Sequence, residues 1–226
     1  MSVPASLLVP IKPLRLAKTR LRGDRPADAH AALVSAVAHD TVEAARRAAG
    51  VREVLVVTSD PELTDSFAAA GVEVVADDPD AGLNPALEHG ERVLRGRGAD
   101  RIGALQADLP ALRPEDLARA LHAAGPERAF TPDRQRTGTT LLLAAAGAAL
   151  APRFGNGSAL AHEASGARRL AGRWESLRCD VDTAADLRRA ARIGLGPRTA
   201  AWLARASQEH ADPGGVPGDS ARTDGA

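Results

Sequence analysis

Cysteine, aromatic residues and lysine are all scarce in this sequence of 226 residues. It contains one cysteine, no tyrosine, three phenylalanines, two tryptophans and two lysines. The single cysteine, Cys179, excludes an intramolecular disulfide and any multi-cysteine metal site, and we expect it to be a small buried hydrophobe rather than a nucleophile. With so few aromatic residues, the core must consist mainly of alanine, valine, leucine and isoleucine. The chain is long enough to bury a sizeable core in one α/β domain.

Long apolar runs and a net charge are missing as well. No stretch approaches the roughly 20 apolar residues of a membrane span, and the N-terminus lacks the basic-then-apolar layout of a secretory signal. The 29 basic residues balance the 29 acidic ones and the arginines are scattered, which argues against a nucleic-acid-binding stripe. We therefore expect a cytoplasmic protein that binds neither membranes nor nucleic acids.

Segments with strand and helix periodicity alternate along the chain. Strands are predicted at 7–11, 51–60, 72–78, 101–110, 137–145 and 174–182. Helices are predicted at 27–50, 61–71, 82–98, 114–125, 158–165 and 183–205. This alternation predicts an α/β fold, with a largely parallel sheet covered by helices on both faces. We expect one domain over 1–206 and a disordered tail over 207–226, which has almost no apolar residues.

The only two lysines of the chain, Lys12 and Lys18, lie six residues apart in the segment VPIKPLRLAKTRL, directly after the first predicted strand. All other basic residues are arginine, 27 of 29. A lysine ammonium suits a phosphate oxygen as a point charge, whereas arginine favours two-pronged contacts. A phosphate-binding loop is one interpretation and a solvated basic loop is the other. The glycines of a Walker A motif are absent.

Carboxylates end two of the predicted strands. Asp108 follows a buried strand, and Asp180 and Asp182 flank Val181, so that both would point to one face of a strand. Ligands of open parallel sheets bind outside the carboxyl ends of the strands, and Mg²⁺ typically takes one or two protein carboxylates together with substrate phosphates. The alternatives are that Asp182 caps the following helix and that Asp108 caps the turn before a proline.

The segment FGNGSALAH resembles an anion cradle. Gly155 and Gly157 would let backbone N–H groups approach a ligand, and Ser158 opens a helix. The hydroxyls of residues 137–140 could lie nearby. A glycine-rich turn with a serine is also common for purely structural reasons. His162 shares the helix face of Ser158, and a packed or capping histidine is the more frequent case.

Seven motifs, in order over about residues 5–205, together resemble the guanylyltransferases that begin assembly of the deazaflavin coenzyme F-420. They are VPIKPLRLAKTRL, VTSD, GLNPAL, LQADLPAL, TGTTLLL, FGNGSALAH and DVDTAADL. The resemblance implies the Rossmann-like three-layer nucleotidyltransferase fold with a mostly parallel mixed sheet. It also implies transfer of GMP from GTP to a three-carbon phosphate acid, with release of pyrophosphate and with Mg²⁺ as cofactor.

The resemblance implies a role for each matched residue. Lys12 and Lys18 would grip the GTP triphosphate, and Lys18 and Asp108 would act in catalysis. The other matched positions are, for guanosine, Thr58, Ser59, Asp60, Leu83 and Asn84; for Mg²⁺, Asp108 and Asp182; and for the acceptor, Thr140, Gly155 and Ser158.

Composition favours phosphoenolpyruvate as the acceptor, because actinobacterial members of the family use it and heavy alanine, arginine and glycine usage indicates a GC-rich genome. The product, enolpyruvyl-diphospho-guanosine, would pass to the next enzyme of the pathway. Alternative acceptors are 2-phospho-L-lactate, 3-phosphoglycerate and molybdopterin, although the LAGG entry expected for molybdopterin is absent. Outside enzymes, a non-catalytic nucleotide-binding module and an interaction protein are the alternatives. The oligomeric state is open, a homodimer included.

Overall fold

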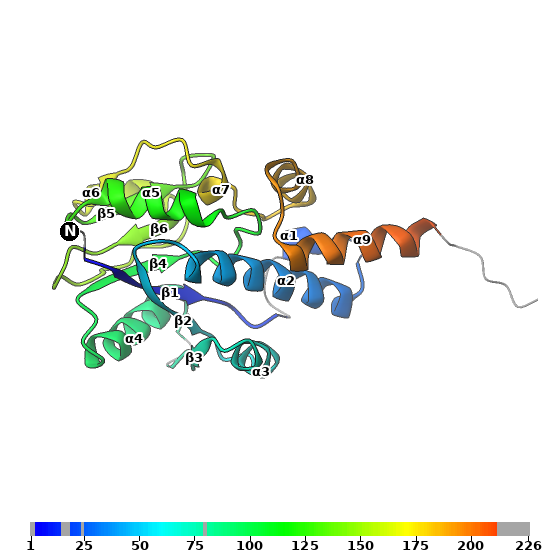
Figure 1. Ribbon diagram of the computed structural model, residues 1–226, viewed down its shortest axis with the longest axis horizontal. Coiled ribbons are helices and arrows are strands. Elements are labelled where there is room, and N and C mark those ends of the chain that lie inside the picture. The colour runs from blue at the N-terminus through cyan, green and yellow to red at the C-terminus, as the bar shows by residue number, and fades with distance from the viewer. Residues whose placement is uncertain (1–2, 15–18, 24, 79–80, 212–226) are drawn as a thin grey trace, which may run out of the picture.

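The computed structural model describes residues 3–14, 19–23, 25–78 and 81–211 (Figure 1). The strands are β1 (Ala5–Pro10), β2 (Val51–Val57), β3 (Glu73–Val75), β4 (Arg101–Leu105), β5 (Ala129–Pro132), β6 (Thr139–Leu143) and β7 (Arg168–Arg169). The helices are α1 (Thr19–Arg22), α2 (Ala27–Arg46), α3 (Pro61–Ala69), α4 (Leu83–Gly96), α5 (Pro114–Ala124), α6 (Ser158–Ala164), α7 (Glu175–Arg178), α8 (Ala184–Ile193) and α9 (Pro197–Ala211).

The strands form one sheet in the order β3-β2-β1-β4-β6-β5-β7. Strand β6 is antiparallel to both of its neighbours, and the other strand pairs are parallel. The chain first builds outward from β1 to β2 and β3, and then places β4 on the other side of β1. This reversal leaves a crevice at the carboxyl ends of β1 and β4, where ligands bind in open α/β sheets. The predicted mixed, mostly parallel sheet is confirmed.

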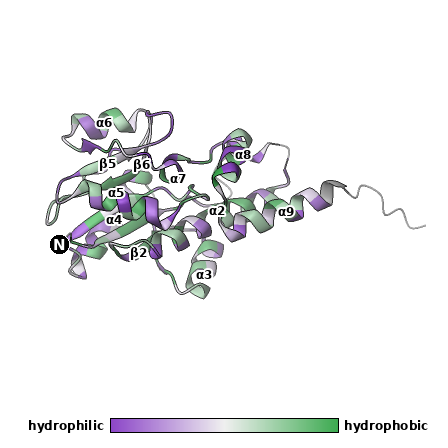
Figure 2. Cartoon of the chain, turned by 45° about the horizontal axis from the view of Figure 1, so that its top comes forward, coloured by the Kyte–Doolittle hydropathy of each residue, from purple (hydrophilic) through white to green (hydrophobic). Residues whose placement is uncertain are grey.

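Helices cover both faces of the sheet because the side chains of each strand alternate between two apolar cores. In β1, Leu7 and Val9 pack into the core under α2, α3, α5 and α7, whereas Leu8 packs under α4 and α6. All three side chains are fully buried, and burying a side chain of this size contributes about 1.5–3 kcal/mol. Helices such as α2, α5 and α9 carry both hydrophobic and hydrophilic residues (Figure 2), as expected for helices with one buried face.

A third apolar cluster lies beyond the carboxyl ends of the strands, where α8 and α9 pack beside the first half of α2 (Figure 1). Helix α2 has 20 residues, so it extends past the sheet and offers a second packing surface there. The cluster includes Leu33, Val37, Val181, Leu187 and Trp202. It therefore fixes the segment around Val181 against α2, next to the switch point of the sheet.

Helix α9 continues to Ala211, five residues into the segment 207–226 that was predicted to be disordered. The added residues contain neither glycine nor proline before Pro213, so nothing in them stops a helix. Residues 212–226 lie outside the described part of the chain. None of the helices formed by the described residues has the length and apolar character needed to cross a membrane.

The predicted strand at 174–182 is wrong. Its first half is the short helix α7, because the apolar residues Trp174 and Leu177 are three apart and both buried, a helical spacing. The predicted helix over 183–205 is two helices, α8 and α9, separated by a break around Gly194. Strands β5 and β7, with four and two residues, escaped prediction because so short a run has no readable period.

Candidate active site

A cleft of about 370 Å³ opens at the switch point between β1 and β4. We call it the switch-point cleft. Its walls come from the loops after β1 and β4, from α1 and α2, from the start of α4, and from the segment before α8. The lining residues are Pro10, Ile11, Lys12, Arg20, Leu21, Val34, Val37, Ala38, Leu83, Gln106, Ala107, Asp108, Val181 and Asp182. The volume falls within the range of small-molecule sites.

Cations and carboxylates come to the switch-point cleft from different elements. Lys12 and Arg20 enter from the loop after β1 and from α1, and Asp108 and Asp182 from the loop after β4 and the segment before α8. Such a set suits a polyphosphate, because ammonium and guanidinium groups bind phosphate oxygens directly. The carboxylates can meanwhile hold a divalent cation that binds the same phosphates.

The loop carrying Asp108 is fixed by its backbone on both sides. The buried Thr41 of α2 donates its hydroxyl to Ala107 O at 3.0 Å, shared with Val37 O at 2.9 Å, and accepts the N–H of Leu109 at 3.0 Å. The N–H of Val181 donates to Asp108 O at 3.0 Å. Asp108 is therefore held between α2 and the segment that ends at Asp182.

Replacing Thr41 with valine is expected to destabilise the protein by about 1–3 kcal/mol, because the shape is kept but the buried N–H of Leu109 loses its acceptor. Urea unfolding would measure the loss, and hydrogen exchange would show faster exchange at the Leu109 amide. The control is Thr41→Ser, which retains the hydroxyl. Equal stability of the valine and serine variants would contradict the role of this hydroxyl.

A second group of polar residues gathers around His162 of α6. Its Nε2 accepts the backbone N–H of Arg153 at 2.9 Å, and its Nδ1 lies 2.9 Å from the hydroxyl oxygen of Thr139. Because a backbone N–H can only donate, Nε2 must be the acceptor nitrogen and Nδ1 must carry the proton. The Phe154 ring packs edge-on against the imidazole, with 4.9 Å between centroids. His162 therefore joins the start of β6 to the loop before Ser158.

His162 is a neutral side chain at ordinary pH. It is completely buried, and burial, followed by the positive charges of Arg128 and Arg153, lowers its pKa to about 4. Protonation would also place a hydrogen on Nε2, which faces the Arg153 N–H. The expectation of a packed histidine is confirmed, and this histidine has no nitrogen left for a substrate.

Two connections join the surroundings of His162 to the switch-point cleft. The side chain of Asn84 in α4 accepts the N–H of Phe154 at 2.8 Å and donates to Phe154 O at 3.0 Å. The N–H of Gln106 donates to Thr140 O at 2.9 Å. The glycine-rich turn before α6, where Gly155 has φ 140°, is thus anchored next to the cleft.

The structure brings some of the predicted site residues together and not others. The lining of the switch-point cleft includes Lys12, Leu83, Asp108 and Asp182. It does not include Thr58, Ser59, Asp60, Asn84, Thr140, Gly155 or Ser158. Lys18 lies outside the described residues, so its role stays a prediction.

The segment 58–60, predicted to face guanosine, has hydrogen bonds of its own. The buried Asp60 carboxylate accepts the N–H groups of Glu62 and Leu63 at the start of α3 and that of Leu14 at 2.8 Å. Ser59 donates to Asp77 O at 3.1 Å. These contacts assign the segment to capping α3 and to holding Leu14. Leu14 belongs to the segment 11–18 after β1 that carries Lys12 and Lys18, which we call the lysine loop. The contact of segment 58–60 with a nucleotide stays a prediction without support from the cleft.

The predicted common direction of the Asp180 and Asp182 side chains is wrong, and one alternative is excluded. Asp180 and Asp182 do not share the switch-point cleft, because the segment is not a strand and only Asp182 lines the cleft. Asp182 is also not the helix cap: Thr183 caps α8, in a reciprocal pair with Asp186. Thr140 is buried, and its hydroxyl donates toward Thr131 O at 3.4 Å, so its contact with the acceptor stays a prediction.

Gln106 and Thr41 were missed by the sequence analysis. Gln106 lines the cleft, and its polar side chain directly after the apolar run at 102–105 was a usable signal. The sequence contains no signal for Thr41, because a threonine within a predicted helix looks like any other polar position.

A metal ion fits the switch-point cleft through its donor set. Asp108 and Asp182 offer carboxylate oxygens, the ligands that Mg²⁺ prefers, and a substrate phosphate would supply the rest. Within the part of the chain that the structure describes, no three His, Cys, Asp or Glu side chains gather as a complete protein metal site. A cation at this place would therefore depend on the substrate for its remaining ligands.

A family model and several named relatives match this chain over most of its length. Residues 30–178 match the model of the MobA-like NTP transferase domain. The chain is 54% identical over 198 residues to a phosphoenolpyruvate guanylyltransferase of Salinispora arenicola, covering 86% of this chain and 91% of the relative. It is 49% identical over 203 residues to a protein of the same name from Streptomyces coelicolor, covering 88% and 96%.

Solved structures share the fold at low sequence identity. A protein of Desulfovibrio desulfuricans described as a nucleotide-diphospho-sugar transferase superposes with a TM-score of 0.69 at 18% identity, over 92% of this chain and 96% of that one. A nucleotidyl transferase from Methanothermobacter gives a TM-score of 0.57 at 22% identity, over 84% and 97%. At such identities the likeness shows the fold alone.

Proposed function

Because the chain belongs to the phosphoenolpyruvate guanylyltransferase family, within the MobA-like NTP transferases, we infer that it transfers GMP from GTP to phosphoenolpyruvate and releases pyrophosphate. The switch-point cleft is the observation that carries this function, because it opposes Lys12 and Arg20 to Asp108 and Asp182 at the crevice where this class of sheet binds ligands. We propose further that the product, enolpyruvyl-diphospho-guanosine, enters coenzyme F-420 assembly and passes to the next enzyme there.

The reaction needs alignment of two polyanions more than it needs a base. An oxygen of the acceptor phosphate attacks the α-phosphorus of GTP, a new P–O–P bond forms, and the bond to the β-phosphate breaks as pyrophosphate leaves. The attacking oxygen is already largely ionised at neutral pH, since the second pKa of a phosphate monoester is about 6. Cationic side chains that bind both reactants therefore supply most of what the transition state requires.

We propose that Lys12, together with Lys18, binds the triphosphate, and that Asp108 and Asp182 hold Mg²⁺. When bound, Mg²⁺ neutralises charge on the phosphates. Arg20 joins this set, because it lines the same cleft. The cations of the lysine loop and α1 then align the α-phosphorus, while Asp108 keeps its position through Thr41 and Val181.

We propose that the turn around Gly155 and Ser158, beside Thr140, receives the phosphate and carboxylate of the acceptor. The anchoring of this turn by Asn84 and His162 supports that place, since both fix the loop next to the switch-point cleft. The Thr140 hydroxyl is engaged inside the sheet, so the acceptor contact there would come from the turn itself. Leu83 at the start of α4 would border the nucleotide.

The function is tested by measuring pyrophosphate release with GTP and Mg²⁺ in the presence of phosphoenolpyruvate, 2-phospho-L-lactate, 3-phosphoglycerate or no acceptor. Release with phosphoenolpyruvate, and a product with the mass of the guanylylated acid, is the expected result. The assay is repeated with the enzyme that consumes the product. GTP binding without release under every condition would instead favour a non-catalytic nucleotide-binding module.

Replacing Lys18 with alanine is expected to raise the KM for GTP strongly and to lower kcat, because the triphosphate loses a cation that also aligns it. Steady-state kinetics at saturating acceptor would measure both. Arg22→Ala is the matched control, since Arg22 is an exposed cation of α1 that does not line the cleft. Unchanged kinetics of Lys18→Ala would remove Lys18 from the triphosphate site.

A further inference from the structure

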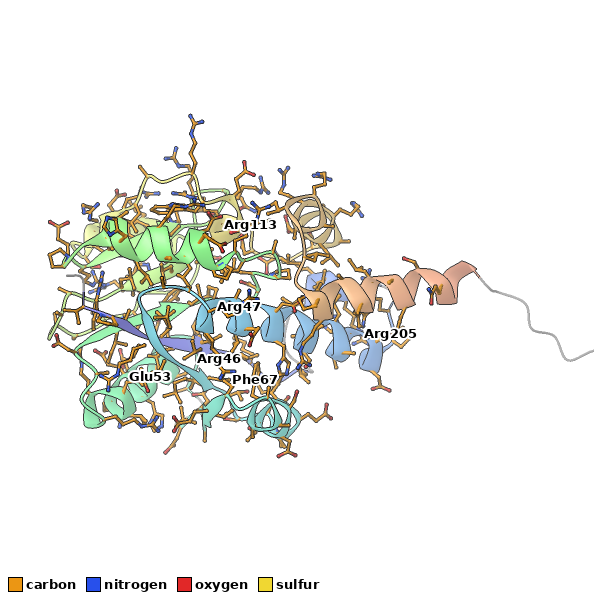
Figure 3. All side chains as sticks on the ribbon, viewed as in Figure 1. Arg46, Arg47, Glu53, Phe67, Arg113 and Arg205 are labelled. Atoms are coloured by element: carbon orange, nitrogen blue, oxygen red, sulfur yellow. The ribbon has the colours of Figure 1, made fainter. Side chains whose placement is uncertain are left out.

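A second cleft, of about 640 Å³, lies between α5, α7 and α8. We call it the arginine cleft. It is lined by Arg113, Asp116, Arg119, Arg134, Arg173, Glu175, Ser176, Arg178, Cys179, Arg189, Arg192 and Ile193. Figure 3 labels Arg113, which stands at the start of α5 close to α7. The segment from Cys179 to Asp182 separates the two clefts, since Cys179 lines this one and Asp182 the other.

Positive charge is concentrated in the arginine cleft far beyond its share of the chain. Arginine accounts for 27 of the 226 residues, but for seven of the twelve that line the cleft. A general abundance of arginine therefore does not explain the cluster. Two carboxylates lie among the seven guanidinium groups, those of Asp116 and Glu175.

Both oxygens of the buried Asp116 carboxylate already have partners within the protein. One of its oxygens pairs with Arg119, and the other accepts the hydroxyl of Ser176 at 2.6 Å. Glu175 is exposed on α7. Six arginines of the cleft therefore share one exposed carboxylate within its lining. Asp186, which pairs with Arg134, and Asp133 and Asp180 add negative charge from outside the lining, but the arginines still outnumber the carboxylates.

Arg178 has hydrogen-bond donors that its protein neighbours use only in part. It is partly buried, and its Nη2 donates to the carbonyl of Leu170 at 2.7 Å. Its Nε is buried without a hydrogen-bond partner in the described part of the chain. Burial, followed by the positive charges of Arg136 and Arg169, lowers the pKa of Arg178, and the negative charge of Asp133 offsets part of this shift. A guanidinium in this setting is stabilised by an anion that supplies the missing acceptor.

Arginines from other elements complete the cleft. Arg113 is oriented by a bond from its Nη2 to Ile193 O at 2.6 Å, and Arg134 lies 3.7 Å from an oxygen of Asp186. The remaining three, Arg173, Arg189 and Arg192, are exposed and make no ion pair with any residue that the structure describes. Their guanidinium groups are therefore available to a ligand.

We propose that the arginine cleft is a second ligand site, which binds a compact oligophosphate, either free or carried by a nucleotide. Guanidinium groups bind phosphate with two parallel N–H donors each, and several converging from different elements suit a chain of phosphates. The cleft has the size of a small-molecule site. This site goes beyond the guanylyltransferase reaction, because its lining shares no residue with that of the switch-point cleft.

Trp174 offers a reporter for this site, since it stands between the lining residues Arg173 and Glu175. The experiment uses a Trp202→Phe background, so that Trp174 is the single tryptophan. Inorganic tripolyphosphate, GTP and a poly-glutamate peptide are titrated without divalent metal while fluorescence is recorded. A saturable change with tripolyphosphate or GTP is expected, and the tighter of the two distinguishes free oligophosphate from nucleotide.

Charge reversal gives the decisive comparison. Arg189→Glu/Arg192→Glu is expected to raise the Kd about tenfold or more, because two charge-assisted contacts become repulsive. Arg173→Glu tests the same site from another element. The matched control is Arg188→Glu, an exposed arginine of α8 outside the lining, which should bind as the parent does. Circular dichroism and Tm confirm that each variant is folded.

Three results would overturn the proposal. The first is the absence of a saturable change in the parent protein. The second is an equal loss in Arg188→Glu and in the double variant, which would mean unspecific charge attraction. The third is tighter binding of poly-glutamate than of either phosphate ligand, which would make an acidic protein surface the occupant.

Discussion

Replacing Asp108 with alanine is expected to lower guanylyltransferase turnover by about 10²–10³-fold, the loss seen when one preorganised electrostatic group is removed from a transition state. The protein should remain folded, because the loop is fixed through the backbone of Ala107, Asp108 and Leu109 by Thr41 and Val181. Pyrophosphate release with GTP and phosphoenolpyruvate measures the effect, and Tm checks the fold.

Two further variants serve as the control for Asp108→Ala and as the test of the second proposed metal ligand. Glu115→Ala removes an exposed carboxylate from the first turn of α5 that does not line the cleft, so its activity should equal that of the wild type. Asp182→Ala should raise the Mg²⁺ concentration needed for half-maximal activity, because it removes the proposed second carboxylate ligand. Normal turnover by Asp108→Ala would show that the assignment of the metal is wrong.

Much of the fold follows from the sequence because its strands and helices have clear periods. The segments around β1, β2 and β4 are apolar runs that lie buried in the middle of the sheet, and all three were predicted. The errors lie where local pattern and tertiary contacts disagree. Residues 174–182 have too few apolar residues to define a period, and the burial of Trp174 and Leu177 on one side of a single helical turn determines the local structure.

The site was predictable where a strand end places a charged group at the switch point. Lys12 and Asp108 follow from that rule, and both line one cleft. Asp182 lines the same cleft, although the strand on which its prediction rested is absent. What single residues bond to could not be predicted in the same way. The Asp60 carboxylate accepts the N–H of Leu14, 46 residues away in sequence. The Asn84 side chain holds the backbone of Phe154, 70 residues away. A motif records that a residue is present, and not which atoms it faces.

These long-range contacts divide the proposed site into reacting and positioning residues. The reacting residues proposed here are the charged members of the cleft lining, Lys12, Arg20, Asp108 and Asp182. The positioning residues Thr41, Asn84 and His162 instead hydrogen-bond to backbone or hydroxyl groups of neighbouring loops. Such residues keep a site rigid, which matters because a small displacement of reacting groups lowers the rate steeply. Their substitution should therefore change kinetics without removing any group that touches substrate.

His162→Gln is the sharpest case, and it is expected to raise the KM for phosphoenolpyruvate more than it lowers kcat. The substitution disturbs the bonds to Arg153 N–H and the Thr139 hydroxyl, and with them the turn proposed to receive the acceptor. The KM for GTP should change little, because the lysine loop is fixed separately through Asp60. Steady-state kinetics with each substrate varied in turn measure this difference.

The same variant should flatten the dependence of stability on pH. The unfolded chain protonates His162 near its ordinary pKa of 6.5, whereas the folded protein resists protonation down to about 4. Between these values the unfolded state binds more protons, so wild-type stability is full above pH 6.5 and falls as the pH drops, by at most about 1.4 kcal/mol per pH unit for this group. His39, with a pKa also lowered to about 4, adds a similar slope that the variant keeps.

Urea unfolding of the wild type and of His162→Gln between pH 4.5 and 7.5 would therefore differ in slope by up to one proton. His122→Ala, which removes an exposed histidine of α5, is the control and should keep the wild-type slope. An identical slope in His162→Gln and the wild type would contradict the neutral, Nδ1-protonated imidazole. A changed KM for GTP with an unchanged KM for phosphoenolpyruvate would separate His162 from the acceptor turn, and the acceptor would then have to bind elsewhere along the cleft.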